Sequence, residues 1–270
     1  MRRIQFIELH EQPWFPPALR NEITDALQCG SEFLKAYAPV SVLLQRALDA
    51  TRSRAIVDVC SGSGGPWLDL SQRLEENTAA YRICLTDKFP NLAAFENVKA
   101  ASANRIDFHR SSVDAMNVPA ELDGFRTMFS SFHHFPRAQA RSILQNAVDA
   151  RRGIDIFEIT SRTASAIGMM FLWFLTPFVF APAIRPFRWS RLLYTYVLPI
   201  IPLVLLFDGL VSCLRTYRTT ELRELIGELE ATEYQWEIGE RSGAFGGLAV
   251  TYLIGYPRED MQARREAQEK

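Results

Sequence analysis

The sequence predicts an α/β fold: a doubly wound, Rossmann-like and mostly parallel sheet with a C-terminal antiparallel hairpin and a large apolar helical insertion. Three observations support this prediction. Five short apolar runs alternate with segments of helical spacing between residues 55 and 158, a glycine-rich segment separates two β-like runs near the C-terminus, and residues 163–207 are far more apolar than the rest. Strands that alternate with helices imply parallel βαβ units, whose sheet is covered on both faces.

The length and composition fit one large domain. The chain has 270 residues, of which 48% are apolar and 23% charged, and this is the balance of an ordinary globular protein. We expect a single domain over residues 1–256, with an N-terminal helical cap at 1–50 and an apolar insertion at 163–207, followed by a charged tail at 257–270.

The net charge and the cysteine content indicate which binding partners and which cellular compartment to expect. The net charge of -1 gives no overall field that would attract nucleic acid, so we expect no nucleic-acid partner. The four cysteines are scattered, and no pair has the spacing of zinc ligands or of a disulfide framework. The sequence therefore predicts a cytoplasmic, reducing environment and no metal requirement.

The expected elements follow one another between polar or glycine-containing segments. Strands are predicted at residues 55–59, 82–87, 106–109, 125–130 and 153–158. Helices are predicted at 31–50, from Pro66, from about Leu92, at 138–150 and at 221–230. The last two runs, 234–239 and 248–255, flank the glycine-rich segment 242–247 and predict an antiparallel hairpin.

A glycine-rich segment follows the first predicted strand. Residues 56–66 combine a strand, a glycine loop and a helix start, and this arrangement suits a nucleotide-like ligand because glycines let ligand atoms approach the backbone. The dinucleotide pattern G-x-G-x-x-G fits poorly, since Gly62 and Gly64 are followed by Trp67 in the third place.

Two acidic motifs in this half of the chain resemble those of the class I S-adenosylmethionine-dependent methyltransferases. Asp58, Gly62 and Gly64 match the first motif of that family, acidic-x-Gly-x-Gly-x-Gly, with Cys60 in place of its first glycine. Asp87 ends the second strand, where the family has its second acidic residue.

Two further motifs complete the resemblance in the same order. Residues 112–116 occupy the third motif, after the third strand. Residues 129–135, which include two adjacent histidines, are similar to the fourth motif of quinone-biosynthesis methyltransferases. The resemblance covers residues 50–160 well and the closing hairpin moderately.

The resemblance implies S-adenosylmethionine as the cofactor. Asp58 would anchor its amino end, the glycines would make room for its methionine part, Asp87 would accept hydrogen bonds from both ribose hydroxyls, and Asp114 would bond the adenine amino group. The expected cofactor residues are Asp58, Cys60, Gly62, Gly64, Asp87, Asp114, Ala115 and Ser130. On the alternative interpretation the aspartates are capping or turn residues and Cys60 is a small packing residue.

Three side chains are candidates for catalysis: His133, His134 and Glu158. Histidine suits general-base work near neutral pH, and Glu158 ends the fifth strand, where ligands of open α/β sheets bind. Alternatively, one histidine packs beneath the substrate while the other faces solvent, and Glu158 pairs with Arg162 on the surface.

The insertion contains two runs without charge, residues 163–184 and 192–207. The first is just long enough to span a bilayer and the second is short for it. The arginines between the runs would face away from the catalytic domain if both runs crossed, and five prolines argue against two straight spans. We expect an apolar lid or shallow hairpin over the substrate pocket that contacts a membrane surface; the alternative is a buried subdomain or a dimer contact.

The expected substrate-binding residues come from the N-terminal region, the insertion and the segment after it. They are Trp14, Phe171, Trp173, Asp208 and Arg215. For Asp208 and Arg215 the alternative is a buried pair that anchors the insertion.

These observations favour methyl transfer to an apolar or lipid-like small molecule. A nicotinamide-dependent oxidoreductase would share the strand-end acid Asp87 but lacks the third glycine. A non-catalytic, membrane-associated subunit that binds the cofactor is the third hypothesis, because Cys60 departs from the first motif.

Overall fold

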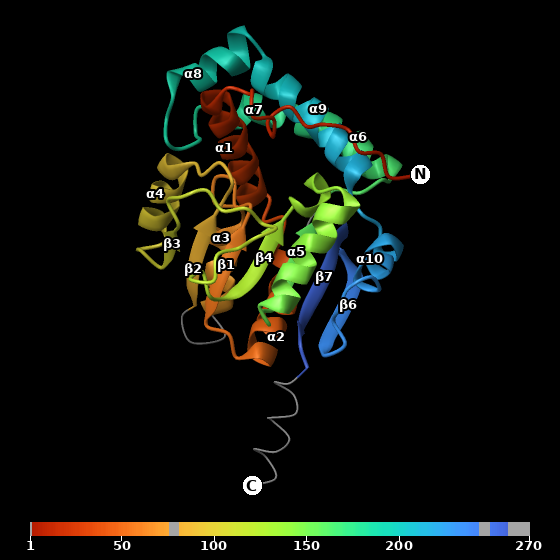
Figure 1. The fold of residues 1–270 in the computed structure, drawn as a ribbon. Coiled ribbons are helices and arrows are strands. Elements are labelled where there is room, and N and C mark those ends of the chain that lie inside the picture. Colours follow the sequence, from red (N-terminus) through yellow and green to blue (C-terminus); the bar gives the residue numbers. More distant parts are fainter. Residues whose placement is uncertain (1, 76–80, 243–248, 259–270) are drawn as a thin grey trace.

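The computed structural model describes residues 2–75, 81–242 and 249–258. Within these ranges the chain forms a seven-stranded sheet (Figure 1). Its strands are β1 (Ala55–Val59), β2 (Arg82–Thr86), β3 (Ile106–Phe108), β4 (Phe125–Phe129), β5 (Ile154–Glu158), β6 (Tyr234–Ser242) and β7 (Ala249–Pro257). Most of the predicted loop at 242–247 and most of the tail at 257–270 lie outside the described residues.

The strand order in the sheet is β3-β2-β1-β4-β5-β7-β6. The first five strands are parallel, whereas β7 runs antiparallel to both β5 and β6. The predicted fold class, a mostly parallel sheet closed by an antiparallel hairpin, is therefore confirmed. The order reverses between β1 and β4, and open α/β sheets bind ligands at the carboxyl ends of the strands at such a point.

Helices cover both faces of the sheet because each carries one apolar face. They are α2 (Ser41–Thr51), α3 (Trp67–Glu75), α4 (Leu92–Ala101), α5 (Arg137–Asp149) and α10 (Thr219–Ile226). One core cluster joins Leu44, Trp67 and Phe95 to one face, and the other joins Leu144 and Leu225 to the opposite face.

The N-terminal region differs from its prediction. Residues 17–33 form α1 (Pro17–Phe33), which begins at a proline because the first helical turn does not need its N–H. The expected helix at 31–50, for which the sequence allowed a bend near Pro39, is interrupted in its first half: the chain leaves α1 after Phe33, Lys35 has a φ of 48°, and η1 (Ala38–Val40) precedes α2.

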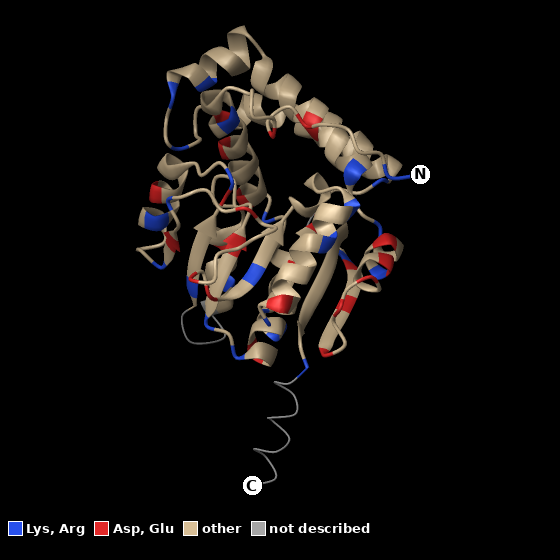
Figure 2. Cartoon of the chain, viewed as in Figure 1, with Lys and Arg blue, Asp and Glu red and all other residues tan. Residues whose placement is uncertain are grey.

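The insertion forms a broken chain of short helices. They are α6 (Ala164–Trp173), α7 (Thr176–Phe180), α8 (Trp189–Leu192), η3 (Leu193–Val197) and α9 (Ile200–Arg215). Figure 1 shows α6, α7, α8 and α9 above the sheet, beyond the arrowheads of the parallel strands, with α1 beneath them. Figure 2 shows how few charges these helices carry, and α6 and α7 have none.

Among the described residues, no single helix is both long and apolar enough to cross a bilayer. Only Trp189–Val197 and Ile200–Arg215 pass that test together, and they are bent by 75° at the break between them.

Candidate functional site

The glycine loop after β1 is shaped by left-handed backbone conformations. Cys60, Gly62, Gly64 and Gly65 have φ values of 60°, 59°, 114° and 53°. Cys60 adopts this region although it has a Cβ, so the loop keeps its shape despite the replaced glycine. At Gly64 a Cβ would lie 2.7 Å from Cγ2 of Val98, so a side chain would not fit.

Asp58 holds the glycine loop to the sheet. Its buried carboxylate accepts hydrogen bonds from Oγ1 of Thr127 on β4, at 2.7 Å, and from Oγ of Ser61 in the loop, at 2.6 Å. Burial raises the pKa of Asp58 to about 7 in spite of these bonds. Each oxygen binds a protein hydroxyl and the residue is only 1% exposed, so in this arrangement Asp58 positions the loop.

Asp87 faces the glycine loop from the end of β2, as the resemblance predicts. Its Oδ2 accepts a hydrogen bond from the N–H of Gly62 at 2.8 Å, and its Oδ1 accepts one from the N–H of Phe89 at 2.7 Å. Burial raises the pKa of Asp87, while the charges of His10 and Arg20 act against this shift.

The segment after β3 lies against the end of β2. The N–H of Val113 donates to the carbonyl of Asp87 at 2.9 Å. Asp114 accepts from the N–H of Met116 at 2.9 Å and pairs with the exposed Lys88 at 3.4 Å. The structure thus brings Asp114 near Asp87 in a turn, the local role that its alternative interpretation proposed.

The remaining two predicted cofactor residues flank the loop. Ala115 is buried in the core on one face of the sheet. Ser130, directly after β4, has a φ of 42°, and its Oγ accepts hydrogen bonds from the hydroxyl of Tyr37 at 2.7 Å and from the N–H of Ile159 at 3.2 Å. Ser130 therefore connects η1 with the ends of β4 and β5.

The two histidines lie where β4 ends, on the short helix η2 (Phe132–His134). The N-terminal segment runs alongside α9 (Figure 1) and binds it through contacts of Leu9 with Asp208 and of Glu11 with Arg215. We call the following side chains the histidine cluster: Glu8, Glu11, His133, His134, Glu158 and Arg215.

His133 is buried between two carboxylates. Its Nδ1 lies 2.6 Å from Oε2 of Glu158, whose Oε1 accepts from the backbone N–H of His133 at 3.1 Å. Its Nε2 lies 3.4 Å from Oε1 of Glu8. Burial lowers the pKa of His133, but the carboxylates of Glu158 and Glu8 outweigh burial and raise it to about 9.

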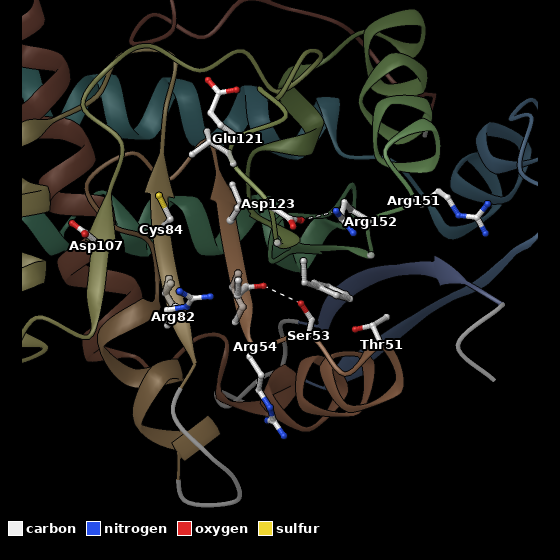
Figure 3. Close-up of a pocket in the computed structure, with 18 of the residues that line it drawn as sticks. Thr51, Ser53, Arg54, Arg82, Cys84, Asp107, Glu121, Asp123, Arg151 and Arg152 are labelled. Carbon is white, nitrogen blue, oxygen red and sulfur yellow. Dashed lines mark hydrogen bonds and ion pairs between the residues drawn. The ribbon is translucent and has the colours of Figure 1, made fainter. Parts of the chain in front are cut away.

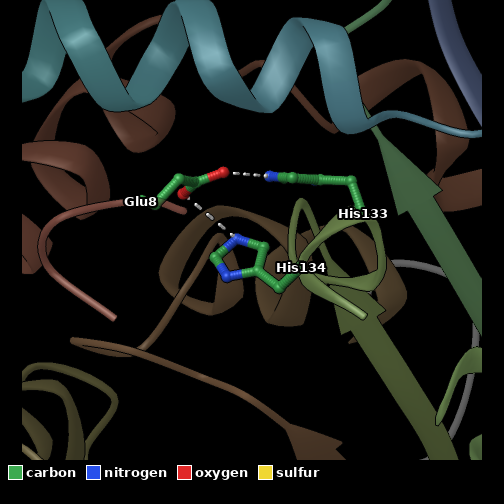
Figure 4. A group of neighbouring side chains, drawn as sticks. All are labelled: Glu8, His133 and His134. Atoms are coloured by element: carbon green, nitrogen blue, oxygen red, sulfur yellow. Dashed lines mark ion pairs between the residues drawn. The ribbon is translucent and has the colours of Figure 1, made fainter. Parts of the chain in front are cut away.

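The surroundings of His134 lower its pKa, whereas those of His133 raise it. Its Nδ1 contacts the carboxylate of Glu11, and its Nε2 lies 3.7 Å from Oε2 of Glu8 (Figure 4). Burial, together with the charge of Arg215, lowers the pKa of His134 to about 4 in spite of Glu8. The two imidazoles lower the pKa of Glu8, which burial alone would raise.

Asp208 and Arg215 do not pair with each other; each binds the N-terminal segment to α9. Asp208 accepts from the N–H of Leu9 at 2.7 Å and lies 2.7 Å from Nδ1 of His10. Arg215 forms ion pairs with Glu11 at 2.8 Å and Glu8 at 3.3 Å. Glu158 contacts His133. The alternative, a surface pair of Glu158 with Arg162, is not formed, and Arg162 pairs with Glu221.

The three aromatic residues predicted to bind substrate are not gathered with the histidines. Trp14 is 66% exposed and Phe171 is 56% exposed. Trp173 packs against α1, where its ring atoms would lie 2.8 Å from a Cβ placed on Gly30. In this arrangement Trp173 fixes the insertion to α1.

A second group of buried polar side chains joins the insertion to the glycine loop, and we call it the arginine cluster. Its members are Glu22, Asp25, Ser63, Asn91 and Arg191. Arg191 lies 2.7 Å from Glu22 and 2.6 Å from Asp25, and Asp25 accepts from Ser63 at 2.8 Å and Asn91 at 2.9 Å. Arg191 is thus directed into the protein, which is incompatible with a hairpin whose connecting arginines all face away from the domain.

Sequence reasoning missed the acidic partners in both clusters. Glu8, Glu11, Glu22 and Asp25 resemble ordinary surface charges in the sequence, and the arginines that they pair with in the clusters lie more than 100 residues away. No periodicity or motif spacing reports such a contact.

The cavity shown in Figure 3, of about 740 Å³, lies at the opposite edge of the sheet. It is lined at the amino ends of β1, β2, β4 and β5 by residues that include Arg54, Arg82, Asp123 and Arg152. A smaller cavity of about 580 Å³ lies between α1, α4 and the insertion and includes Ser63 of the glycine loop and Glu32.

No protein-family model and no curated protein sequence matches this chain. Solved structures do match. The O-methyltransferase NcsB1 from neocarzinostatin biosynthesis, in complex with S-adenosylmethionine and 2-hydroxy-5-methyl naphthoic acid, is 14% identical, with a TM-score of 0.53 over 88% of this chain and 57% of its own. TnmH is 16% identical, with a TM-score of 0.51 over 88% of this chain and 58% of its own.

An O-methyltransferase family protein from Burkholderia thailandensis is 14% identical, with a TM-score of 0.49 over 87% of this chain and 59% of its own. The chain thus spans less than two thirds of the length of the structures that it matches. At these identities the similarity to NcsB1 and TnmH, both with TM-scores above 0.5, shows the fold.

Proposed function

We propose, from the class I methyltransferase fold of this chain, that it transfers a methyl group from S-adenosylmethionine to a small-molecule acceptor. One observation carries the proposal: the glycine loop meets Asp87 through the N–H of Gly62, at 2.8 Å, where the strand order reverses. This is the edge of an open α/β sheet at which ligands bind. NcsB1, which shares the fold, was solved with this cofactor bound.

The residues at this edge fit the cofactor. Each carboxylate oxygen of Asp87 accepts one hydrogen bond from the protein and keeps capacity for another, as two ribose hydroxyls require. Gly64 lets the loop pack closely against Val98, and Asp58 fixes the loop to β4. When bound, S-adenosylmethionine supplies an electrophilic methyl group, so the task of the protein is to hold donor and acceptor in line.

The histidine cluster is the proposed acceptor side of the site. It lies at the ends of β4 and β5, and β4 pairs directly with β1, which leads into the glycine loop. Of the two histidines, His134 is the one that can accept a proton near pH 7, because a pKa of about 4 leaves its ring neutral there and 21% of its side chain is exposed. His133, with a pKa of about 9, stays charged at that pH and would position Glu8.

The acceptor that we propose is apolar or lipid-like. The insertion exposes large apolar side chains, among them Leu172, Val179, Trp189, Val197 and Leu203. Contiguous apolar surface on a protein commonly marks a contact with a ligand, another protein or a membrane. We therefore also propose contact with a membrane surface through this segment; flotation with lipid vesicles tests it, and Trp189→Ser with Val197→Ser should reduce the bound fraction.

Titration of the purified chain with S-adenosylmethionine and with NADH by calorimetry tests the proposed function. We expect saturable binding of S-adenosylmethionine and no binding of NADH. Binding of NADH alone would support the oxidoreductase alternative. Binding of S-adenosylmethionine without methyl transfer from labelled cofactor to any extract component would support the non-catalytic alternative.

A further inference from the structure

Three ligand-type side chains converge inside the histidine cluster. Glu8, His133 and His134 each offer one atom, and these atoms lie within 4.8 Å of one another. Figure 4 shows the carboxylate of Glu8 facing both rings, with one oxygen directed at each. Glu8 and His133 are almost completely buried, at 1% and 2% exposure.

The spacing of these atoms suits coordination better than direct hydrogen bonding. The Nε2 atoms of His133 and His134 lie 3.4 Å and 3.7 Å from the oxygens of Glu8, beyond the usual hydrogen-bond distance. Ligand atoms bound to one tetrahedral zinc ion at about 2.05 Å lie about 3.3 Å apart. Among the described residues, Nε2 of His133 is buried without any hydrogen-bond partner.

Both rings are oriented from behind by a carboxylate. Nδ1 of His133 lies 2.6 Å from Glu158, and Nδ1 of His134 contacts Glu11. Metal-binding histidines almost always donate their second N–H to a carboxylate or carbonyl, which fixes the tautomer and leaves the other nitrogen free for the metal. The cluster contains this arrangement twice, with both free nitrogens on the side of Glu8.

The charge balance of the surroundings favours a dication. Four carboxylates meet here, those of Glu8, Glu11, Glu158 and Asp208. Two guanidiniums reach the same place: Arg215 pairs with Glu8 and Glu11, and Arg3 donates to the carbonyl of His133 at 3.1 Å. Metal ligation requires neutral imidazoles, so the proton that His133 holds in the metal-free cluster would be released on binding. Two negative charges would then remain, which one divalent cation would compensate.

We propose that Glu8, His133 and His134 form a binding site for one divalent transition-metal ion, with Zn²⁺ as the probe. Glu8 would face the metal with both oxygens, since Oε1 lies 3.4 Å from Nε2 of His133 and Oε2 lies 3.7 Å from Nε2 of His134. Two histidines and one carboxylate are a ligand set that zinc and non-haem iron use, with a coordination position left open. The site lies within the histidine cluster, so the proton-acceptor role proposed for His134 belongs to the metal-free chain. Binding of the metal does not depend on methyl transfer.

The test uses the full chain without an affinity tag, stripped with a chelator and titrated with Zn²⁺ by calorimetry, with Co²⁺ absorption as a readout of geometry. We expect one equivalent of Zn²⁺ and a visible Co²⁺ spectrum typical of a four-coordinate site. His134→Gln removes a proposed ligand and should weaken Zn²⁺ binding by ~100-fold or more. Glu11→Gln removes only the carboxylate behind that ligand and should weaken binding about 10-fold, because loss of an outer partner has effects of that size. His109→Asn, outside the cluster, is the matched control and should bind like the unchanged chain.

Glu8→Gln and His133→Asn complete the set if they fold, as judged by circular dichroism. His134 and Glu11 are each about one fifth exposed, so their variants keep the test valid if the more buried ones do not fold. A chain that binds S-adenosylmethionine but no stoichiometric Zn²⁺, or Zn²⁺ binding that His134→Gln leaves unchanged, would overturn the metal site and leave the proposed function intact. Zn²⁺ binding lost in His134→Gln from a chain that fails to bind S-adenosylmethionine would support the metal site and count against the methyltransferase proposal.

Discussion

Two buried polar clusters tie the N-terminal region to the rest of the molecule, and they differ in the groups that can titrate. In the arginine cluster, one guanidinium lies between the carboxylates of Glu22 and Asp25. In the histidine cluster, two imidazoles lie among the carboxylates of Glu8, Glu11 and Glu158. Both clusters join segments that are far apart in the sequence.

The difference separates a structural role from a chemical one. Arginine stays protonated in proteins, so Arg191 can only remain a fixed positive charge between its partners. Imidazole can lose a proton or bind a metal through a ring nitrogen. The same way of attaching an N-terminal segment therefore makes a rigid joint under the insertion and a reactive centre at the ends of β4 and β5.

The largest effect is expected from breaking the arginine cluster. Arg191→Met would leave Glu22 and Asp25 buried without their cation and should lower the free energy of unfolding by about 3–5 kcal/mol. Urea unfolding followed by circular dichroism measures it. The exposed Arg185→Met is the control and should change stability by less than about 0.5 kcal/mol. A decrease of less than about 1 kcal/mol in the free energy of unfolding of Arg191→Met would contradict the structural role of this cluster.

Substitutions in the histidine cluster should change the turnover of methyl transfer. His134→Asn should lower the turnover of methyl transfer by ~10²-fold, the usual contribution of a general base, with the affinity for S-adenosylmethionine nearly unchanged. His109→Asn is again the control. If His134→Asn and His133→Asn both keep near-normal turnover, the chemistry rests on positioning alone and the contrast between the clusters fails.

Asp87 tests the cofactor side, which adjoins the arginine cluster through the glycine loop. Asp87→Ala should weaken S-adenosylmethionine binding by ~1.5–3 kcal/mol, the range for lost hydrogen bonds to a charged group. The exposed Asp107→Ala, on β3, should bind as before. Equal affinities of the two folded variants, by calorimetry, would remove Asp87 from the site.

The smallest effect concerns Glu32 on α1, near the arginine cluster. Its carboxylate accepts from the N–H groups of Leu68 and Asp69, and burial raises its pKa from 4.5 to about 7. The folded state therefore holds this proton more tightly than the unfolded chain, so the contribution to stability is complete below pH 4.5 and is lost as the pH rises through about 7. Glu32→Gln should flatten this part of the curve.

Urea midpoints of both proteins at about pH 5 and about pH 8 measure the effect. The drop in midpoint between the two should be smaller for Glu32→Gln than for the unchanged chain. Identical drops would show that Glu32 titrates alike in both states.

The sheet could be predicted from the sequence because its signals are local. The runs that became β1, β2 and β4 are short, apolar and bounded by turn residues, and their predicted ends lie within one residue of the observed ones. The antiparallel hairpin was visible for the same reason. The helix α1 was expected only as an unspecified part of the helical cap at 1–50, although Pro17 is compatible with a first helical turn and marks where it begins.

Only the residues of the candidate site that follow strands could be predicted from the sequence, and their acidic partners could not. Gly62, Asp87 and His133 follow strands, and strand ends at one edge of a parallel sheet must lie near one another. Their acidic partners depend on contacts such as Glu8 with Ser212, across 204 positions, which no local pattern records. A charged residue in a proline-containing segment looks the same in the sequence whether it is exposed or completely buried.

The position of Glu8 and Glu11 also determines when the histidine cluster is completed during synthesis. Glu11 leaves the ribosome 204 residues before Arg215, its partner on α9. The strands β1 to β5 and the glycine loop are made between these two residues, and local elements form before contacts of high sequence separation. A nascent chain released before α9 would thus present the glycine loop but not the closed histidine cluster, and the N-terminal segment would dock as one of the last steps of folding.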